Sequence, residues 1–410
     1  MSAPNKTELT AAAPLETLTG RRLALVVTGG VAAYKAADLS RLWIKAGAQV
    51  RVVLTENAAR FITPLTFESL TGQPVALDMW SRPQYDIEHI SLADWAEAVV
   101  VAPATANFLA KMAHGLADDF ASTFMLAFDG PKLVAPAMNS RMLAAAATQD
   151  NMSALMERGV MVAPSEGGLL ACGAVGDGRL ADLNTIALMA ARALGPNDFA
   201  GRAVAVTAGS TRESWDDIRF MANRSTGKMG LSLALAAWLR GAEVTLVAGP
   251  SLTQMPPKLP DFSIKPVEST RDMLAALEET KFQTLIMAAA PADFRPAERV
   301  SGKIKKSGGP PTLPLTSNPD ILKSLPRDGR VFVGFAAEDQ ELVERAKGKL
   351  RDKNLDLIAA NQAGGDGNAF AADDNHLWLA DKNGEVTEIT PRPKFAAAWS
   401  ILDAVLKLRK

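Results

Sequence analysis

The stretch Leu23-Ala24-Leu25-Val26-Val27-Thr28-Gly29-Gly30 decides the fold of the first half of this chain. A short aliphatic run that ends in two glycines is typical of a buried β-strand followed by a tight turn. A helical pattern follows from Ala32 to Lys45, Gly47 ends it, and a second apolar run extends from Gln49 to Thr55. The order strand, helix, strand predicts a β-α-β unit.

The second half of the chain begins in the same way. The apolar run Ala203–Thr207 ends in Ala208-Gly209, and a helix is predicted from about Met229 to Arg240, with Gly241 as its cap. The next strand is predicted at Val244–Ala248. Two such beginnings, about one domain length apart, indicate two domains rather than a solenoid of short repeats.

Strands and helices continue to alternate through both halves. Alternation of this kind implies parallel sheets covered by helices on both faces, so the expected class is α/β, with two doubly wound, mostly parallel-sheet domains. The segment Leu194–Asp198 is the best linker, which divides the chain into a disordered tail (1–20), a first domain (21–194) and a second domain (195–410). Further strands are expected at Ala98–Val101, Lys132–Ala135, Val160–Ala163, Thr284–Ala288, Val331–Phe335 and Leu355–Ala359.

The composition is that of a globular protein. Of the 410 residues, 48% are hydrophobic and 22% are charged, and the net charge is −1. This balance favours neither nucleic acid nor an anionic membrane as a partner, and no apolar run is long enough to span a bilayer. The first twenty residues lack the apolar core of a signal peptide, so we expect a cytoplasmic protein. Three histidines, His89, His114 and His376, stand at no metal-ligand spacing.

The one cysteine, Cys172, has glycine at three of the next six positions. A segment so rich in glycine is expected to form a loop that can fold tightly over a ligand. A thiol on such a loop is well placed to meet a substrate, although a lone cysteine is commonly a small buried apolar residue. Both interpretations stay open on local sequence alone.

Several turns of the first half combine small residues with polar ones. Thr28-Gly29-Gly30 before a helix can bind a phosphate, although glycine also serves close packing in such turns. Pro103–Asn107 and Pro136–Asn139 offer small residues, against which a flat ring can lie, and an amide. Either asparagine can instead cap a helix, and an isolated histidine such as His89 is more often structural.

These features resemble the FMN-dependent cysteine decarboxylase family, most closely phosphopantothenoylcysteine decarboxylase. The resemblance implies a flavodoxin-like flavoprotein domain that binds FMN. It implies that His89, Asn139 and Cys172 are catalytic: Asn139 holds the substrate carboxylate, His89 acts as base or orienting group, and Cys172 donates a proton. The motifs that carry it are Gly29–Lys35, Glu88–Ile90, Ala102–Asn107, Pro136–Asn139 and Ala171–Arg179. The implied FMN-binding residues are Gly29, Gly30, Val31, Thr55, Ala104, Thr105, Asn107 and Met138.

Two segments of the second half suit an anion. Arg219–Gly230 places Ser, Thr, Gly and Lys at a helix start, which favours an anionic ligand. The same pattern is also typical of an ordinary capped helix. Gly302–Gly309 is a lysine-rich loop that could close over a triphosphate. The alternative is that its lysines simply form a solvated surface.

The second half resembles phosphopantothenate–cysteine ligase, whose bacterial form uses CTP. Both halves together resemble the family of bifunctional coenzyme A biosynthesis enzymes, in which a Rossmann-like ligase domain follows the decarboxylase. The ligase motifs are Thr207–Glu213, Asn223–Gly230, Ala292–Arg295, Lys303–Lys306, Asn318–Leu322, Gly334–Glu338 and Lys353–Asp356.

This second resemblance implies the substrates 4'-phosphopantothenate, cysteine and CTP. Asn223 is implied to bind an acyl-cytidylate, Lys303 to neutralise charge during nucleotidyl transfer, and Asp293 to hold Mg²⁺. The chain departs from the family at Ser214–Asp217, which replaces a more proline-rich stretch, and at Pro291. The implied CTP-binding residues are Met287, Ala288, Ala289, Asp293, Lys303, Pro319, Asp320, Ile321, Leu322, Phe335, Lys349 and Lys353.

Two other functions are compatible with parts of the sequence. Relatives of the decarboxylase act as flavin-binding regulatory proteins, and two α/β domains also suit an NAD(P) oxidoreductase, although the G-x-G-x-x-G spacing is missing. The resemblance implies a homo-oligomer, with decarboxylase trimers that hold FMN between subunits and ligase dimers, together a dodecamer.

Overall fold

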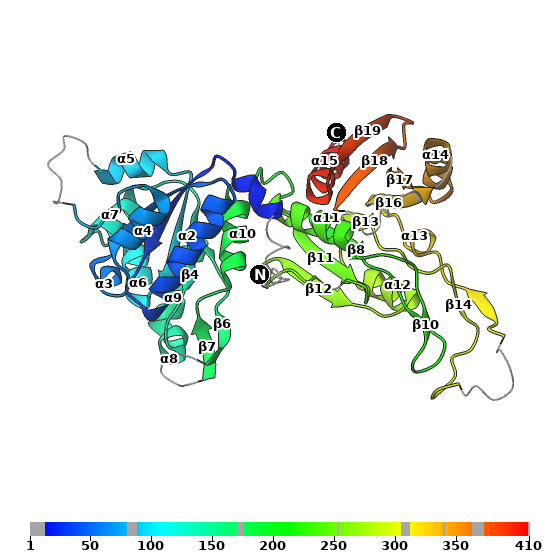
Figure 1. Cartoon of the computed structure of the whole chain (residues 1–410), viewed down its shortest axis with the longest axis horizontal. Coiled ribbons are helices and arrows are strands. Elements are labelled where there is room, and N and C mark those ends of the chain that lie inside the picture. Colours follow the sequence, from blue (N-terminus) through cyan, green and yellow to red (C-terminus); the bar gives the residue numbers. More distant parts are fainter. Residues whose placement is uncertain are drawn as a thin grey trace. The chain divides into compact units, whose positions relative to one another are not determined.

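The computed structural model describes residues 13–79, 88–169, 175–252, 254–304, 312–338, 341–362 and 373–408. The chain forms two compact units (Figure 1). Unit 1 comprises Met1–Pro196 together with Pro256–Pro260, and unit 2 comprises Asn197–Met255 and Asp261–Lys410. Among the helices of the described ranges, none is long and apolar enough to cross a membrane.

Unit 1 is built on a parallel five-stranded sheet. Its strand order is β2-β1-β3-β4-β5, the order of flavodoxin-like doubly wound folds. Because helices cover both faces, the central strand β3 is buried along its whole length, and its sequence reads as continuous small and apolar residues. The expected α/β class is therefore confirmed. The strands are β1 (Arg22–Val27), β2 (Gln49–Leu54), β3 (Ala98–Ala104), β4 (Lys132–Pro136) and β5 (Met161–Val162).

The helices of unit 1 follow the strands as predicted, with one difference at the first. The helix expected from Ala32 begins as the 3-10 turn η2 (Val31–Tyr34) and becomes α-helical only in α2 (Lys35–Lys45). The others are η1 (Glu16–Leu18), α3 (Glu56–Ala59), α4 (Pro64–Thr71), α5 (Glu88–Trp95), α6 (Ala106–His114), α7 (Phe120–Ala127), α8 (Ser140–Ala144), α9 (Ala146–Glu157) and α10 (Leu183–Ala193).

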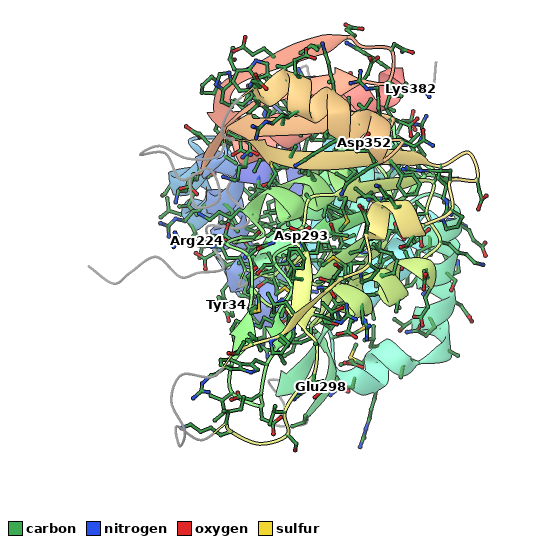
Figure 2. The ribbon with its side chains drawn as sticks, turned by 90° about the vertical axis from the view of Figure 1, so that its right-hand side faces the viewer. Tyr34, Arg224, Asp293, Glu298, Asp352 and Lys382 are labelled. Carbon is green, nitrogen blue, oxygen red and sulfur yellow. The ribbon has the colours of Figure 1, made fainter. Side chains whose placement is uncertain are left out.

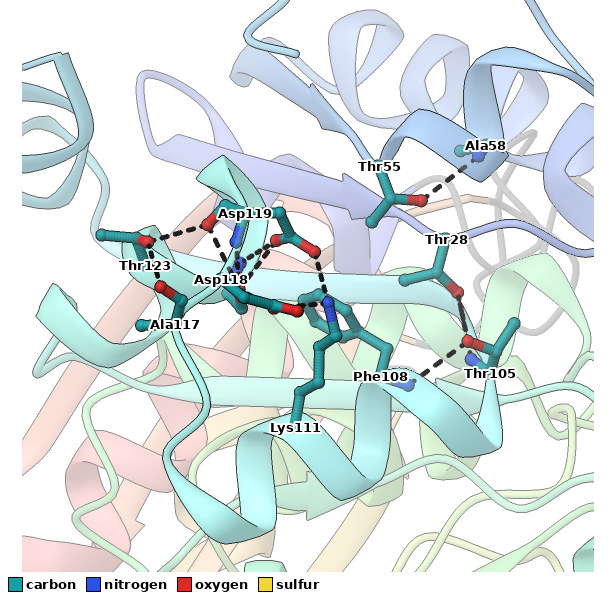
Figure 3. Close-up of polar contacts among 11 residues, drawn as sticks. Thr28, Thr55, Ala58, Thr105, Phe108, Lys111, Ala117, Asp118, Asp119 and Thr123 are labelled. Atoms are coloured by element: carbon teal, nitrogen blue, oxygen red, sulfur yellow. Dashed lines mark hydrogen bonds and ion pairs between the residues drawn. The ribbon is translucent and has the colours of Figure 1, made fainter. Parts of the chain in front are cut away.

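An ion-pair cluster joins the end of α6 to the start of α7 (Figure 3). Lys111 Nζ lies 2.5 Å from Asp118 Oδ1 and 2.7 Å from Asp119 Oδ2. Asp119 also caps α7 by accepting the Ser122 N–H. Burial opposes ionisation of Asp119, but the hydrogen bonds from Lys111 and Ser122 together outweigh it and hold the pKa of Asp119 below its ordinary value. This contact is therefore present at neutral pH and is lost as the pH falls through that lowered pKa.

A hairpin that the sequence did not predict follows the sheet. Strand β6 (Glu166–Leu169) pairs with β7 (Val175–Arg179), so the expectation of a loop is wrong for Val175–Arg179. The glycines of β7 are needed for close approach: a Cβ on Gly178 would lie 2.2 Å from the Met138 carbonyl oxygen. Residues 170–174 lie outside the described residues.

Unit 2 contains an eight-stranded sheet of order β12-β11-β8-β13-β16-β17-β18-β19. The first six strands are parallel, in the order of the Rossmann fold, and β18 and β19 add an antiparallel edge. The predicted strands are confirmed, apart from shifted ends. The strands are β8 (Ala203–Ala208), β11 (Glu243–Ala248), β12 (Phe262–Pro266), β13 (Thr284–Met287), β16 (Val331–Glu338), β17 (Leu357–Gln362), β18 (Asp374–Asp381) and β19 (Val386–Pro393).

The helix α11 (Lys228–Leu239) is the most buried helix of unit 2 and packs on β8 and α15. Its close approach to the strand requires Gly230, where a Cβ would lie 2.6 Å from the Thr207 carbonyl oxygen. This contact fixes the start of the helix beside the carboxyl end of β8. The other helices are α12 (Thr270–Glu278), α13 (Ile321–Ser324), α14 (Leu342–Asp352) and α15 (Lys394–Lys407).

Two short hairpins form an arm that extends from this sheet (Figure 1). We use "the arm" for residues 212–224, 293–304 and 312–317. It contains β9 (Glu213–Ser214), paired with β10 (Phe220–Met221), and β14 (Phe294–Pro296), which pairs with β15 (Leu315–Ser317) and packs against β9.

One buried guanidinium ties unit 2 together. Arg240, whose side chain is 2% exposed, lies 2.6 Å from an Asp198 oxygen and 2.7 Å from an Asp403 oxygen. It donates to the Trp399 carbonyl and stacks between that indole and the Phe199 ring. It thus connects the end of α11 to α15 and to the first residues of the unit.

We expect Arg240→Met to destabilise unit 2 by about 3 kcal/mol, because it leaves two carboxylates and a carbonyl without their donor. For a domain of this size the melting temperature should fall by roughly 6–12 °C. Calorimetry of the full chain measures this transition. Arg271→Met, on the exposed side of α12, is the matched control and should shift it by no more than about 1 °C. Equal shifts for both variants would contradict the assigned role of Arg240.

Candidate functional site

The carboxyl edge of the first sheet is held by hydrogen bonds between strand ends (Figure 3). Thr28 Oγ1 donates to the Pro103 carbonyl at 2.7 Å. It also accepts the Thr105 N–H at 3.0 Å, and Figure 3 shows the contact between these two threonines. The turn after β1 and the turn after β3 are therefore fixed to each other. These turns hold most of the residues predicted to bind FMN.

The next turn joins the same edge to the hairpin. The Ala137 N–H donates to the Ala104 carbonyl, and the Met138 N–H donates to the Gly178 carbonyl at 2.9 Å. Asn139, the predicted catalytic amide, follows directly in this turn. The turn that carries Asn139 is thus bonded to β7, the strand that follows the Cys172 segment.

The capping alternatives are resolved by the structure. Asn139 does cap a helix, since its Oδ1 accepts the Arg141 N–H at 2.9 Å. Asn107 does not: it lies inside α6, and Thr105 is the cap. Thr55 caps α3 in the same manner. Three polar side chains at this edge therefore have orientations fixed by backbone contacts.

The two glycines after β1 serve different purposes. A Cβ on Gly29 would lie 2.4 Å from the Asn57 Cβ, so packing alone requires glycine there. A Cβ on Gly30 would meet only the Thr105 methyl, at 3.7 Å, so among the described residues no other atom lies within 4 Å of that position. Val31 and Tyr34, in the following turn, are more than half exposed.

Besides Asn139, two catalytic residues are predicted in unit 1, His89 and Cys172, and the structure describes only His89. His89 lies on α5, partly buried, with its ring edge-on to Phe120 of α7 at 6.4 Å between centroids. Cys172 lies outside the described residues, between β6 and β7.

Gly178→Ala should detach the hairpin from the Asn139 turn, because Gly178 combines a φ of +125° with the closest approach to Met138. We expect faster hydrogen exchange of the Met138 amide, measured by mass spectrometry of the peptide that contains it. Gly72→Ala is the matched control, since Gly72 also has a positive φ but has open space around it. Unchanged exchange in Gly178→Ala would contradict this docking.

Unit 2 contains a cavity of about 470 Å³ at the carboxyl ends of β13, β16 and β17. The N-terminal end of α11 and the segment before it form one wall. The cavity brings together five of the predicted residues from four separate segments: Asn223, Ala288, Ala289, Phe335 and Lys349.

Positive charge dominates this cavity. Lys228, Lys349 and Lys394 line it, together with the N-terminal end of α11. Lys228 pairs with Asp373 at 2.6 Å. Burial, and then the charge of Lys228, lower the pKa of Lys394 below its ordinary value. The arrangement suits an anion such as a phosphate or a carboxylate.

Amide side chains complete the lining. Asn223 Nδ2 donates to the Pro291 carbonyl at 2.9 Å. Proline can make this contact because the contact uses its carbonyl oxygen and not an N–H group. Asn375 is 7% exposed, and its Oδ1 has no hydrogen-bond partner in the described part of the chain. Both amides can therefore contribute polar contacts to a ligand.

Other predicted nucleotide residues lie around α13, outside the lining. Lys353 Nζ pairs with Asp320 Oδ2 at 3.1 Å, and Asp320 caps this short helix. The side chains of Ile321, Leu322 and Met287 are buried in the core of unit 2, so only their backbone atoms could reach a ligand. Pro319 directly precedes the cap.

The predicted metal ligand and the predicted catalytic lysine belong to the arm. Asp293 is exposed just before β14, and Lys303 is exposed further along the same segment, beyond Glu298 (Figure 2 labels Asp293 and Glu298). In the part of the chain that the structure describes, no cluster of three or more metal-binding side chains occurs.

Three cavity residues were missed by the sequence reasoning. Asn361 is the second-last residue of β17, so the rule that ligands bind at the carboxyl ends of parallel strands could have found it. Asn375 and Lys394 lie at the starts of β18 and α15, in a region where no element was predicted. No local motif marks either residue.

Two family models match the chain. "Flavoprotein" matches residues 11–194, and "DNA/pantothenate metabolism flavoprotein C-terminal domain" matches residues 199–408.

Whole-length relatives are found as well. The coenzyme A biosynthesis bifunctional protein CoaBC of Bacillus subtilis (strain 168) is 41% identical over 402 residues, which cover 96% of this chain and 98% of the relative. The protein of the same name from Escherichia coli (strain K12) is 41% identical over 379 residues, 90% of this chain and 92% of the relative.

Solved structures resemble each half. The C-terminal domain of a CoaBC protein is 35% identical, with a TM-score of 0.44, and the match covers 52% of this chain and 97% of that one. The FMN-dependent cysteine decarboxylase SpaF is 32% identical, with a TM-score of 0.37, and the match covers 42% and 99%.

Proposed function

The chain belongs to the family of coenzyme A biosynthesis bifunctional proteins, and we propose that it carries out two reactions of that pathway, one in each unit. Unit 2 ligates 4'-phosphopantothenate to cysteine, and unit 1 decarboxylates the product to 4'-phosphopantetheine. The observation that carries this function is the end-to-end match, which spans 96% of this chain and 98% of its relative from Bacillus subtilis.

Unit 1 is a flavoprotein unit, and its residues fit FMN. Gly30 leaves open space at the carboxyl edge of the sheet, and the small residue Ala104 lines the same edge. Thr55 and Thr105 add hydroxyl groups at helix starts, where a phosphate is favoured. We assign FMN binding to these residues and to Gly29, Val31, Asn107 and Met138.

Decarboxylation of a cysteine residue needs an electron sink, and FMN supplies that chemistry when bound by accepting and returning electrons. The capping bond to Arg141 fixes the amide of Asn139, which holds the substrate carboxylate. The ring of His89, oriented by Phe120, serves as base or orienting group. Cys172 protonates the carbon left by CO₂ loss, as a thiol of suitable acidity can do.

Unit 2 must activate a carboxylate, because a carboxylate does not react with an amine at neutral pH. We infer that CTP supplies the activating group, forming an acyl-cytidylate and releasing pyrophosphate. The lysine-rich cavity suits the phosphates, and Asn223 at its wall suits the intermediate. The pair Lys353–Asp320 lies with the predicted nucleotide residues around α13.

Mg²⁺ commonly binds through one or two carboxylates and the phosphates of a nucleotide. Asp293 is exposed and able to provide one carboxylate, and the described residues hold no cluster of three metal-binding side chains, which fits a metal that arrives with CTP. We therefore assign Mg²⁺ to Asp293 and the bound triphosphate.

A homo-oligomer follows from the same family resemblance. The exposed apolar residues Val31 and Tyr34 next to the FMN edge favour cover by a second subunit. We propose decarboxylase trimers with FMN between subunits and ligase dimers, together a dodecamer.

The function is tested by incubating the purified protein with phosphopantothenate, cysteine, CTP and Mg²⁺. Mass spectrometry should detect phosphopantetheine, and the protein should show a flavin absorbance spectrum. Accumulation of phosphopantothenoylcysteine without CO₂ release would instead favour a flavin-binding regulatory role for unit 1.

Lys303→Gln should abolish formation of the acyl-cytidylate, because the lost positive charge no longer balances the charge that develops on the transferring phosphate. Decarboxylation of supplied phosphopantothenoylcysteine should stay within about twofold, since Lys303 belongs to unit 2. Asn223→Ala should impair ligation at the level of the bound intermediate. Equal loss of both activities in Lys303→Gln would contradict the division of labour between the units.

Cys172→Ser should release CO₂ but stop at an ene-thiol product, because a serine hydroxyl is far less acidic than a thiol with a pKa of about 8.5. Mass spectrometry of the product distinguishes this species from phosphopantetheine by two mass units. His89→Asn should block the reaction before CO₂ is lost. Normal product from Cys172→Ser at the parent rate would make this cysteine a packing residue.

A further inference from the structure

The backbone on both sides of Lys303 is held by two adjacent carboxylates of the arm. The Gly302 N–H donates to Asp217 Oδ2 at 2.7 Å, and the Ile304 N–H donates to Asp216 Oδ2 at 3.2 Å. The residue before Lys303 and the residue after it are thus each bonded to a different carboxylate. The Lys303 side chain itself is exposed.

Asp217 makes further contacts with the Lys303 segment. Its own N–H donates to the Gly302 carbonyl at 3.3 Å, so Asp217 and Gly302 exchange two hydrogen bonds. Its other carboxylate oxygen accepts from Arg299 at 3.0 Å. A neighbouring backbone bond, from Val300 to Trp215, continues the pairing. Together these contacts connect the arm segment that contains Asp217 to the arm segment that contains Lys303.

Asp216 is itself held in place. Its side chain is buried, and its Oδ1 accepts the N–H groups of Ile218 and Arg219 at 2.8 and 2.6 Å. The Arg219 guanidinium lies 3.4 Å from the other oxygen. A carboxylate fixed in this way is a rigid acceptor for Ile304.

Both carboxylates are ionised at neutral pH. Burial opposes ionisation of Asp216, but the backbone N–H groups of Ile218, Arg219 and Ile304 outweigh it and lower its pKa. The hydrogen bond from Gly302, and then Arg299, lower the pKa of Asp217. The bonds to the Lys303 segment are therefore charge-assisted, the stronger kind of hydrogen bond.

We propose that Asp216 and Asp217 are positioning residues for Lys303, which fix its backbone so that its ammonium group meets the CTP triphosphate in one geometry. The inference rests on the proposed function, in which Lys303 acts on CTP. Both residues belong to Ser214–Asp217, one of the stretches where this chain departs from the family it resembles. The lysine ammonium group stands at the end of a flexible four-carbon chain. It therefore stabilises a charged group well only where the lysine backbone is already held in position.

The test uses the full chain with its cofactor. Asp217→Ala should lower kcat/KM for CTP in the ligase reaction about tenfold, the order expected for one lost hydrogen bond to a charged group. Asp217→Asn, which keeps an acceptor but not the charge, should give a smaller loss. Decarboxylation of supplied substrate should not change. Glu298→Gln, which removes an exposed carboxylate from the same segment, is the matched control and should leave ligation unaltered.

A double-mutant cycle separates positioning from general stability. CTP affinity, measured by calorimetry, should fall in Asp217→Ala, but Asp217→Ala should have no further effect in the Lys303→Gln background. Hydrogen exchange of the peptide that contains Gly302 and Ile304 should be faster in Asp217→Ala. Because Asp217 is about half exposed, this variant is expected to fold.

Equal losses of CTP affinity in both backgrounds, or normal kinetics of Asp217→Ala beside an inactive Lys303→Gln, would overturn the positioning role and leave the role of Lys303 intact. Full ligase activity of Lys303→Gln would remove the role of Lys303 and this inference with it.

Discussion

Parallel strands can be joined only by a connection that crosses the sheet, and this constraint organises both units. Every strand of a parallel sheet ends at the same edge, so turns far apart in sequence meet there. In unit 1 the constraint brings Thr28 within hydrogen-bond distance of Thr105. In unit 2 it brings Ala288, Phe335 and Asn361 to one cavity. The topology of each sheet therefore places residues from distant parts of the sequence at one edge.

The edges work as sites because backbone atoms approach one another closely. Gly178 allows β7 to reach the Met138 carbonyl, and Gly230 allows α11 to reach the end of β8. A side chain at either position would clash with the backbone that the glycine approaches, so the two elements would have to shift. The same close approach places the N-terminal end of α11 and Lys228 at the ligand cavity. The first N–H groups of a helix have no partner within the helix and suit an anion.

The parallel core could be predicted from the sequence, because buried parallel strands read as continuous apolar runs between helical patterns. That signal found β1, β3, β8 and β13, and the family motifs found the turns after them. The capping role of Asn107 could not be decided in this way, since Thr105 competes for the same helix start. Asn375 and Lys394 reach the cavity from the antiparallel edge, where pairing depends on tertiary contacts rather than on a local pattern.

Two features that the sequence did not predict, the hairpin β6–β7 and the arm, consist of short elements and adjoin the groups on which the proposed chemistry depends. The hairpin β6–β7 flanks Cys172, and the arm carries Lys303. Strands of two to five residues bury too little apolar surface to leave a periodic signal, so their order comes from hydrogen bonds to the backbone. In the hairpin, the Met138 N–H donates to the Gly178 carbonyl. In the arm, Asp216 and Asp217 accept the N–H groups of Ile304 and Gly302. In the arm, Lys303 thus carries an exposed side chain on a backbone that Asp216 and Asp217 hold on both sides.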